Sequence, residues 1–539
     1  MNKILSYIIA LGGAFAASTQ CFAVSGDSTG VYRDFDFVRQ QNIWLHQHNA
    51  SGLTIYNRKS ISTGEVGFQY GKGGLIDYYQ SPSTFQVSAN VESFYRLNKR
   101  TVVYGKMEYD NYTGKEMAGS AWIDPTRRPF DITEDSLTNI GKKHRDTYQL
   151  IGAFGIDLYK GFSLGARLDY TAANYAKYKD LRHKNSLMDM TVTVGLMAPV
   201  GNFMKIGANY YYHRNTESLK FSEYGKTERT YKSLINYGVF IGDIEQFSNS
   251  GLTDKNNEFP ILDQSHGADV QLSFQFGNFS FFNNMLFAHQ QGYYGKDSPY
   301  TIIFTRHHSN IYKYDGQLAW QQNRNLHQLN VSLEVENLVN EKQSYRSITE
   351  ETGTSYYEYY DPIKTANKLW ANTRVAYSGY YNINGDLPTT TLQLGVDLMR
   401  RKQTAYYYPY FRRQELRSTE IFMQASHNFP IGKQLLTVSL GGSWLNGSGN
   451  PFEDGTFITP SDKQTGMNTM IPYLYRNYDY LTASRYSLNG SVKYSFIIPK
   501  TTLHTYVLAQ VNHRKTSEIS EYTLGKDHTT LHFRVGCVF

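Results

Sequence analysis

The chain has 539 residues, a formal net charge of +7 and a mean hydropathy of −0.51, and 15% of its residues are aromatic, 46 of them tyrosine. Beyond its N-terminus it has no apolar run near the ~20 residues of a membrane-crossing helix, which excludes a helical membrane protein. A charge this small and dispersed excludes a nucleic-acid footprint. Tyrosine-rich chains of low hydropathy are typical of transmembrane β-barrels, where half of each strand faces water and aromatic girdles mark both interfaces.

The N-terminus has the pattern of an export signal. A basic Met1-Asn2-Lys3 precedes the apolar stretch Ile4 to Ala17, and Cys21-Phe22-Ala23 places small residues where a signal peptidase cleaves. Gln20 occupies a position where a lipoprotein signal needs a small residue, so we set that alternative aside. We therefore expect residues 1–23 to be a cleaved signal peptide. Removing them leaves Cys537 as the remaining cysteine, so no internal disulfide is expected.

The rest of the chain divides into two expected parts. Residues 24–60 are predicted to be a periplasmic N-terminal segment with a short helix from about Asp34 to His48, which either enters the barrel or lies beneath it. Residues 61–539 are predicted to be an outer-membrane β-barrel. A TonB-dependent receptor needs a plug domain before its barrel, and Val24 to Ser60 is far too short for one.

Alternating segments recur along the chain in pairs joined by short connections rich in Gly, Asn or Lys, the strongest local signal of a β-hairpin. The predicted pairs are 85–97 with 102–112, 148–159 with 162–174, 188–197 with 203–213, 270–276 with 279–290, 311–321 with 326–338, 369–381 with 389–401, 420–429 with 435–445 and 486–498 with 501–513. With an opening strand near 62–70 and a closing strand at 531–539, the sequence predicts a single antiparallel transmembrane barrel of about 18 strands, within a range of 14 to 18.

The topology and the lumen follow from this pattern. The barrel is expected to lie in the cell outer membrane. With a periplasmic N-terminus, every short turn then lies in the periplasm and every long loop lies outside the cell. In the clearest strands the apolar residues alternate with charged ones, which we expect to face the lumen. These candidate lumen-facing residues are Arg167, Asp169, Glu334, Glu336, Asp397 and Arg534.

The closing strand places Leu531, Phe533 and Val535 on one face and His532 and Arg534 on the other. It ends on Phe539, which resembles the terminal aromatic signal read by the outer-membrane barrel assembly machinery. The expected partners are therefore outer-membrane lipid, that machinery and another outer-membrane receptor, with no nucleic acid.

The export signal, Asn49-Ala50-Ser51-Gly52-Leu53 leading into Glu65-Val66-Gly67-Phe68, and the hairpins that follow resemble an uncharacterised outer-membrane β-barrel family of Bacteroidota. That family is registered only as a domain of unknown function. The resemblance spans the mature chain and is strongest from about Asn49 to Arg214. It implies an integral outer-membrane location and brings no substrate, catalytic residue or cofactor.

Two functions remain open. The first is a channel or uptake component for small solutes, since a lumen of mixed charge suits a hydrated channel. The same charged residues are equally suited to form ion pairs with one another that fill the lumen and close the barrel. The second is a surface ligand-binding barrel that assists another receptor, because aromatic and arginine side chains in the outer loops can stack on flat ligands. The candidate loop contacts are Tyr356, Tyr359, Tyr407, Tyr410 and Arg412.

A remote third function is an outer-membrane lipid hydrolase. Arg306-His307-His308-Ser309-Asn310 resembles the His-x-Ser-Asn stretch of outer-membrane phospholipases, and His307 and Ser309 would share a lipid-facing side of a strand. The Gly expected next is Ile311, and the barrel is about twice too large, so we interpret the match as a chance loop sequence. We expect no enzyme, no cofactor and no metal site, since His46-x-His48 and His307-His308 lack a third ligand nearby.

Overall fold

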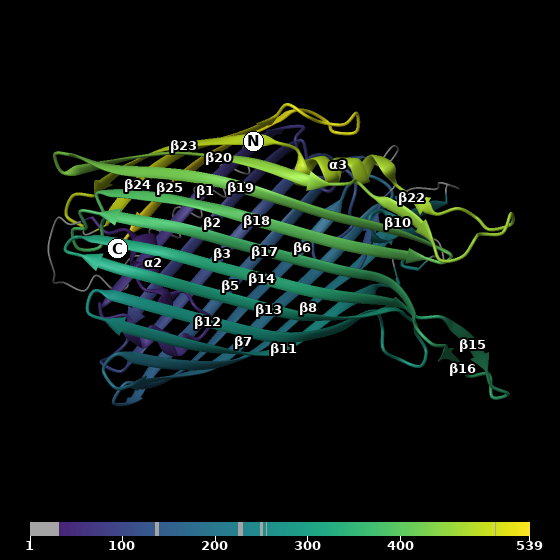
Figure 1. Cartoon of the computed structure of the whole chain (residues 1–539), viewed down its shortest axis with the longest axis horizontal. Coiled ribbons are helices and arrows are strands. Elements are labelled where there is room, and N and C mark those ends of the chain that lie inside the picture. Colours follow the sequence, from purple (N-terminus) through teal and green to yellow (C-terminus); the bar gives the residue numbers. More distant parts are fainter. Residues whose placement is uncertain (1–31, 135–139, 225–229, 248–251, 255, 502) are drawn as a thin grey trace.

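The computed structural model describes residues 32–134, 140–224, 230–247, 252–254, 256–501 and 503–539. Its main feature is a closed antiparallel wall of 18 long strands (Figure 1). The wall strands are β1 (Ser60–Gly73), β2 (Ser83–Arg96), β3 (Thr101–Met117), β5 (Gly141–Tyr159), β6 (Phe162–Lys177), β7 (Arg182–Val200), β8 (Met204–Ser222), β11 (Phe259–Phe276), β12 (Phe279–Gly295), β13 (Ile303–Gln322), β14 (Asn325–Lys342), β17 (Ile363–Tyr381), β18 (Thr390–Tyr407), β19 (Tyr410–Ile431), β20 (Gln434–Gly449), β23 (Arg485–Ile497), β24 (His504–Thr516) and β25 (Asp527–Val538).

The first and last strands close the wall. β1 pairs with β25 from Thr63–Val538 to Gly73–His528. Beyond that ladder the backbones of Ser62 and Phe539 exchange two further hydrogen bonds of 2.8 and 3.0 Å. All eight predicted hairpins and both terminal strands are present, so the predicted barrel of about 18 strands is confirmed.

Several predicted strands begin too late in the sequence, and β11 starts at Phe259 rather than Val270. The late starts of β13 and β19 affect the candidate residues. β13 starts at Ile303 rather than Ile311, so His307-His308 belongs to a strand and not to a loop. β19 starts at Tyr410 rather than Glu420, and only Tyr408-Pro409 connect it to β18 at the long-loop end. In both places the outward positions become polar or charged, as at Arg306 and Arg413, so the apolar alternation vanishes although the strand continues.

The wall has an apolar outside and a polar inside. In β6 the side chain of Leu168 is 45% exposed, whereas Arg167 and Asp169 on either side of it turn to the lumen side and bond to each other. In β25 Phe533 and Val535 are likewise exposed. Among the described residues, no helix is both long and apolar enough to cross a bilayer.

Residues 32–56, which we call the N-terminal plug, fill the lumen at the end where the tight turns lie. The plug contains α2 (Phe35–Gln40) and two 3₁₀ helices, η1 (Ile43–Leu45) and η2 (Ala50–Ile55). Helix α2 lies within the stretch predicted to be helical and is much shorter than it, and the segment lies inside the barrel. The side chains that it buries against the wall are Phe35, Phe37, Val38, Trp44, Leu45 and Leu53.

Glycines on the inner wall make room for the plug. Gly155 of β5, Gly165 of β6 and Gly195 of β7 are direct cross-strand neighbours. A Cβ on Gly165 would overlap the backbone of Ala50 and Ser51, so only glycine lets η2 lie this close to the wall.

A second insertion closes the long-loop end. Four short strands from three different loops form one small sheet, which we call the lumen sheet: β4 (Asp131–Thr133), β9 (Tyr231–Gly238), β10 (Ile241–Phe247) and β22 (Asn468–Thr469). Its apolar side chains pack on inward residues of β8, β11, β12 and β13, with Trp122, Phe130 and Tyr294 fully buried between them. This core fixes the lumen sheet to one side of the wall.

The remaining elements lie at the same end. Helix α3 (Ile471–Thr482) and β21 (Glu453–Thr456) border the mouth, and β15 (Tyr345–Thr349) with β16 (Ser355–Tyr359) forms a hairpin that projects beyond the wall (Figure 1).

Replacing Gly165 with Leu should displace the N-terminal plug and leave the wall intact, because the new side chain needs the space of Ala50 and Ser51. Trypsin should then cleave the folded protein after Arg39, which is scored by mass spectrometry, while heat-modifiable gel mobility reports the intact barrel. The control is Gly152→Leu on β5, where a Cβ has no neighbour within 4 Å. Equal protection of Arg39 in both variants would refute the glycine docking.

Candidate functional site: a lumen closed from both ends

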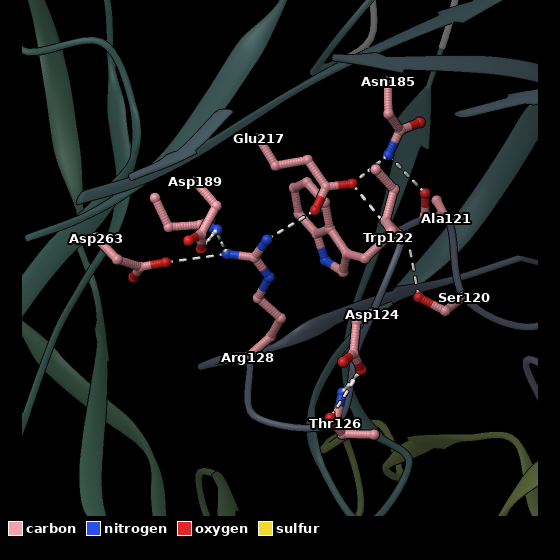
Figure 2. A network of polar contacts seen from close by, with 12 residues as sticks. Ser120, Ala121, Trp122, Asp124, Thr126, Arg128, Asn185, Asp189, Glu217 and Asp263 are labelled. Carbon is pink, nitrogen blue, oxygen red and sulfur yellow. Dashed lines mark hydrogen bonds and ion pairs between the residues drawn. The ribbon is translucent and has the colours of Figure 1, made fainter. Parts of the chain in front are cut away.

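A loop between β3 and β5 carries the charged contacts that close the lumen at the long-loop end. We call residues 118–134 the lumen loop. The guanidinium of Arg128 donates to Glu217 of β8 at 2.7 Å and to Asp263 of β11 at 2.9 Å (Figure 2). Burial alone would lower the pKa of Arg128, but Glu217 and Asp263 raise it above its ordinary value. The arginine therefore stays charged and pins the loop to two wall strands.

The preceding arginine reaches another part of the wall. Arg127 donates to Glu334 at 2.8 Å and to Glu336 at 3.5 Å, both on β14. Adjacent residues of one loop thus bind carboxylates on three wall strands, β8, β11 and β14. Four carboxylates facing one lumen would repel one another without these cations.

The end of the lumen loop is held by a buried carboxylate. Glu134 accepts from Lys143 of β5 at 2.5 Å and also contacts Lys177 of β6. Burial would raise the pKa of Glu134, but Lys143 and Lys177 outweigh it and hold the pKa at about 2. The docked loop thus depends on Glu134 being ionised.

A cavity of about 430 Å³ remains on the side of the barrel opposite the apolar core. Its walls come from β1, β2, β3, β5 and β6 and from β23 to β25, with residues of the segment 74–82 and Ile123 of the lumen loop completing it. Arg145 and Arg514 line it together with Tyr79, Tyr112 and Tyr175, and none of the described lining residues is acidic. The Nε of each arginine is buried without a hydrogen-bond partner.

Below the cavity a polar layer separates it from the N-terminal plug. Glu65 of β1 accepts from Arg534 of β25 at 3.2 Å and from Tyr506 of β24 at 2.9 Å. Arg39 of the plug donates to Glu92 of β2 at 3.0 Å. Cavity, polar layer and plug therefore follow one another along the same strands.

The structure pairs each of the six candidate lumen residues with an opposite charge. Arg167 bonds to Asp169 at 2.8 Å, Asp397 to Arg374 at 3.2 Å, and Arg534 to Glu65. Glu334 and Glu336 are brought together by Arg127, while the other four lie apart from them. Their part in solute passage stays a prediction.

The candidate loop contacts divide into two groups. Tyr356 and Tyr359 belong to the projecting hairpin, as strand residues of β16. Tyr407 and Tyr410 also lie on wall strands, at the facing ends of β18 and β19. Arg412 is 3% exposed and its guanidinium binds Asp454 at 2.6 and 2.9 Å, so it acts here as an internal contact and not as an exposed ligand contact.

The hydrolase alternative is wrong in its geometry. His307 and Ser309 do share a face of β13, but it is the lumen face, where they are 3% and 0% exposed. The ring of His307 bonds to Asp263 at 2.5 Å. A buried pair cannot reach lipid. Within the described ranges, no group of three or more His, Cys, Asp or Glu side chains could hold a metal ion.

Sequence reasoning missed the residues that close the lumen. Arg127-Arg128 lies between Pro125 and Pro129 in a loop, and paired arginines flanked by prolines are a signal that could have drawn attention. Arg145 and Arg514 stand at ordinary polar positions of their strands, so nothing local distinguishes them. The predicted signal peptide lies outside the described residues, and the role of Phe539 in assembly stays a prediction.

Comparisons with known proteins give a family and distant barrels. The model of a family described as "Family of unknown function (DUF6850)" matches residues 50–539. This agrees with the predicted uncharacterised family, while an origin in Bacteroidota stays a prediction. No curated protein matches the chain.

Several solved structures resemble the chain at low identity. The ferric preacinetobactin receptor BauA of Acinetobacter baumannii shares 9% identity at a TM-score of 0.39, covering 90% of this chain and 80% of that one. The ferripyoverdine receptor of Pseudomonas aeruginosa shares 10% identity at a TM-score of 0.37, covering 90% of this chain and 72% of that one. The FrpB iron transporter of Neisseria meningitidis shares 9% identity at a TM-score of 0.34, covering 91% of this chain and 83% of that one. These values are too low for a shared mechanism to be inferred.

Acid should loosen the lumen loop. Docking lowers the pKa of Glu134 from 4.5 to about 2, so its contribution is present above pH 4.5 and is lost as the pH falls toward 2. A spin label on Thr126→Cys, with Cys537→Ala, should gain mobility over this range in electron paramagnetic resonance spectra. Glu134→Gln should be mobile already at pH 7. Unchanged mobility from pH 7 down to pH 2 would contradict the role of Glu134.

Proposed function

The chain belongs to the DUF6850 family, whose function is unknown, and we propose that it is an outer-membrane barrel for the uptake of a small anionic solute, closed at rest by its own chain. The observation that carries this proposal is the cavity lined by Arg145 and Arg514, enclosed in a lumen that the N-terminal plug and the lumen loop fill from opposite ends.

The outer surface supports the membrane location. Outward side chains of the wall form an apolar band, with exposed residues such as Leu168, Leu333, Val492 and Phe533 on strands all around the barrel. Exposed apolar surface of this extent is stable only against lipid or another apolar partner. The closed pairing of β1 with β25 leaves no sheet edge, as a barrel in lipid requires.

The arrangement of the filler indicates where a solute would pass. The lumen sheet is fixed by its apolar core to the wall from β8 to β18. The cavity lies on the opposite side, where polar and charged residues separate it from the plug. Ion pairs and hydrogen bonds can exchange for solvated ones at low net cost, whereas an apolar core cannot. We therefore place the path along β1 to β3 and β23 to β25.

The charge of the cavity selects the solute class. Two guanidinium groups line the cavity, no described lining residue is acidic, and Arg145 lies 3.7 Å from Asp110 of β3 outside the lining. Each guanidinium offers an Nε–H that has no acceptor, which favours an anion. Three lining tyrosines add flat apolar surface. The volume of about 430 Å³ is within the usual range of small-molecule sites.

The projecting hairpin favours a second candidate function, ligand capture at the surface. Tyr345, Tyr357 and Tyr359 pack edge to face on β15 and β16, outside the wall. Tyr345 and Tyr359 keep 41% and 36% of their surface exposed. A barrel that stays closed under all conditions would favour this function over uptake.

Planar-bilayer recordings test the uptake path. The parent protein should show little conductance, because both ends of the lumen are filled. Gly165→Leu, which frees the plug, should produce stable open channels, and Gly152→Leu should resemble the parent. A displaced plug, proven by cleavage after Arg39, together with a silent bilayer would reject the path along this wall.

Loosening the lumen loop should raise that conductance further. In the Gly165→Leu background, Arg127→Gln with Arg128→Gln leaves Glu217 and Glu336 without an ion-pair partner, while Glu334 keeps Lys313. Removing one partner of a buried ion pair typically costs about 3–5 kcal/mol, so the part of the loop around these two arginines should loosen while Trp122 and Phe130 stay packed. Conductance equal to that of Gly165→Leu alone would show that the lumen loop does not limit passage.

The two cavity arginines should set ion selectivity. In the Gly165→Leu background, Arg145→Gln with Arg514→Gln should reduce the chloride-to-potassium permeability ratio several-fold, measured as a shift in reversal potential. Arg413→Gln, which removes one positive charge at an exposed arginine outside the cavity, is the control and should leave the ratio unchanged. An unchanged ratio in the double variant would contradict the anionic solute.

A further inference from the structure

The strands β18 and β19 are neighbours in the wall (Figure 1), and four cationic residues lie at outward positions on them. They are Arg400, Lys402, Arg413 and Arg417, and all four are exposed. Outward positions of these strands are apolar up to Leu398 and Ile421, which are 41% and 56% exposed. The cluster thus begins where the apolar band ends, on the side of the long loops.

The cluster holds more positive than negative charge. Arg400 lies directly opposite Arg417 in the ladder, and like charges in this position destabilise a sheet. A single oxygen, Oε1 of Glu415, accepts from both arginines at 2.9 Å. With Glu453 opposite Arg413, two carboxylates face four cations, which leaves a net charge of +2.

The surface is hollowed at this place. A depression of about 450 Å³ is lined by Lys402, Arg413, Glu415 and Arg417 together with Ser448 and Asn450. It is large enough to receive a polar headgroup, and its cationic side chains can bind phosphate oxygens from more than one side.

We propose that this cluster binds the phosphorylated headgroup of a lipid in the outer leaflet. A soluble anion would need only the charges, whereas this site continues without a gap into the apolar band, where acyl chains would lie beside Leu398 and Ile421. Basic residues at a membrane surface attract anionic headgroups in this way. The proposal rests on the proposed membrane location but not on solute uptake.

Native mass spectrometry in detergent tests the site with dioleoyl phosphatidic acid, and with dioleoyl phosphatidylcholine as the zwitterionic lipid with the same chains. The parent should retain phosphatidic acid in preference to phosphatidylcholine. Arg400→Gln with Arg417→Gln should lower the retained fraction at least five-fold. Glu415→Gln, which removes the carboxylate that competes for the arginines, should retain at least as much as the parent.

The matched control is Lys99→Gln with Lys433→Gln, which removes the same charge from exposed tight turns at the opposite end of the barrel. It should retain phosphatidic acid as the parent does. Equal loss in this control, or undiminished binding in Arg400→Gln with Arg417→Gln, would overturn the site. Inorganic phosphate that displaces the lipid at low millimolar concentration would also overturn it, because a soluble anion would then suffice.

Discussion

The width of a closed 18-strand wall is the constraint on which the rest of the molecule depends. In barrels of this size the side chains of opposite walls do not meet, so the interior is either a water-filled channel or is filled by additional chain. Here the chain fills it twice, with residues 32–56 at the tight-turn end and with the lumen loop and lumen sheet at the other. The pairing of β1 with β25 fixes the circumference and so leaves an interior that either water or additional chain must fill.

Apolar packing and ion pairs both hold these insertions, and their balance differs between the two sides of the barrel. Apolar packing around Ile235, Tyr237 and Ile241 attaches the lumen sheet to one side of the wall, and Trp122 and Phe130 of the lumen loop belong to the same core. Ion pairs of Arg127, Arg128 and Glu134 attach the lumen loop, and glycines such as Gly165 receive the plug. The cavity lies where polar contacts prevail, which is also where rearrangement costs least.

The role of the charged lumen residues depends on their ion-pair partners. Glu334 and Glu336 at alternate positions of one strand are compatible with an open, cation-attracting pore or with internal ion pairs. Arg127 resolves this in favour of ion pairs, and it comes from a loop more than 200 residues away in the chain. Charge in the remaining cavity is then set by Arg145 and Arg514, with the opposite sign.

The sequence by itself determined the wall. Period-two alternation and tight turns are local properties, so they predict all eight hairpins and both terminal strands, and they miss strand ends at places where outward residues turn polar, as at Arg306 and Arg413. The contents of the lumen were decided by tertiary structure. The approach of Arg128 to Glu217 and Asp263, and of Ser51 to Gly165, joins segments far apart in sequence whose local patterns carry no trace of one another. Barrel closure alone brings them face to face.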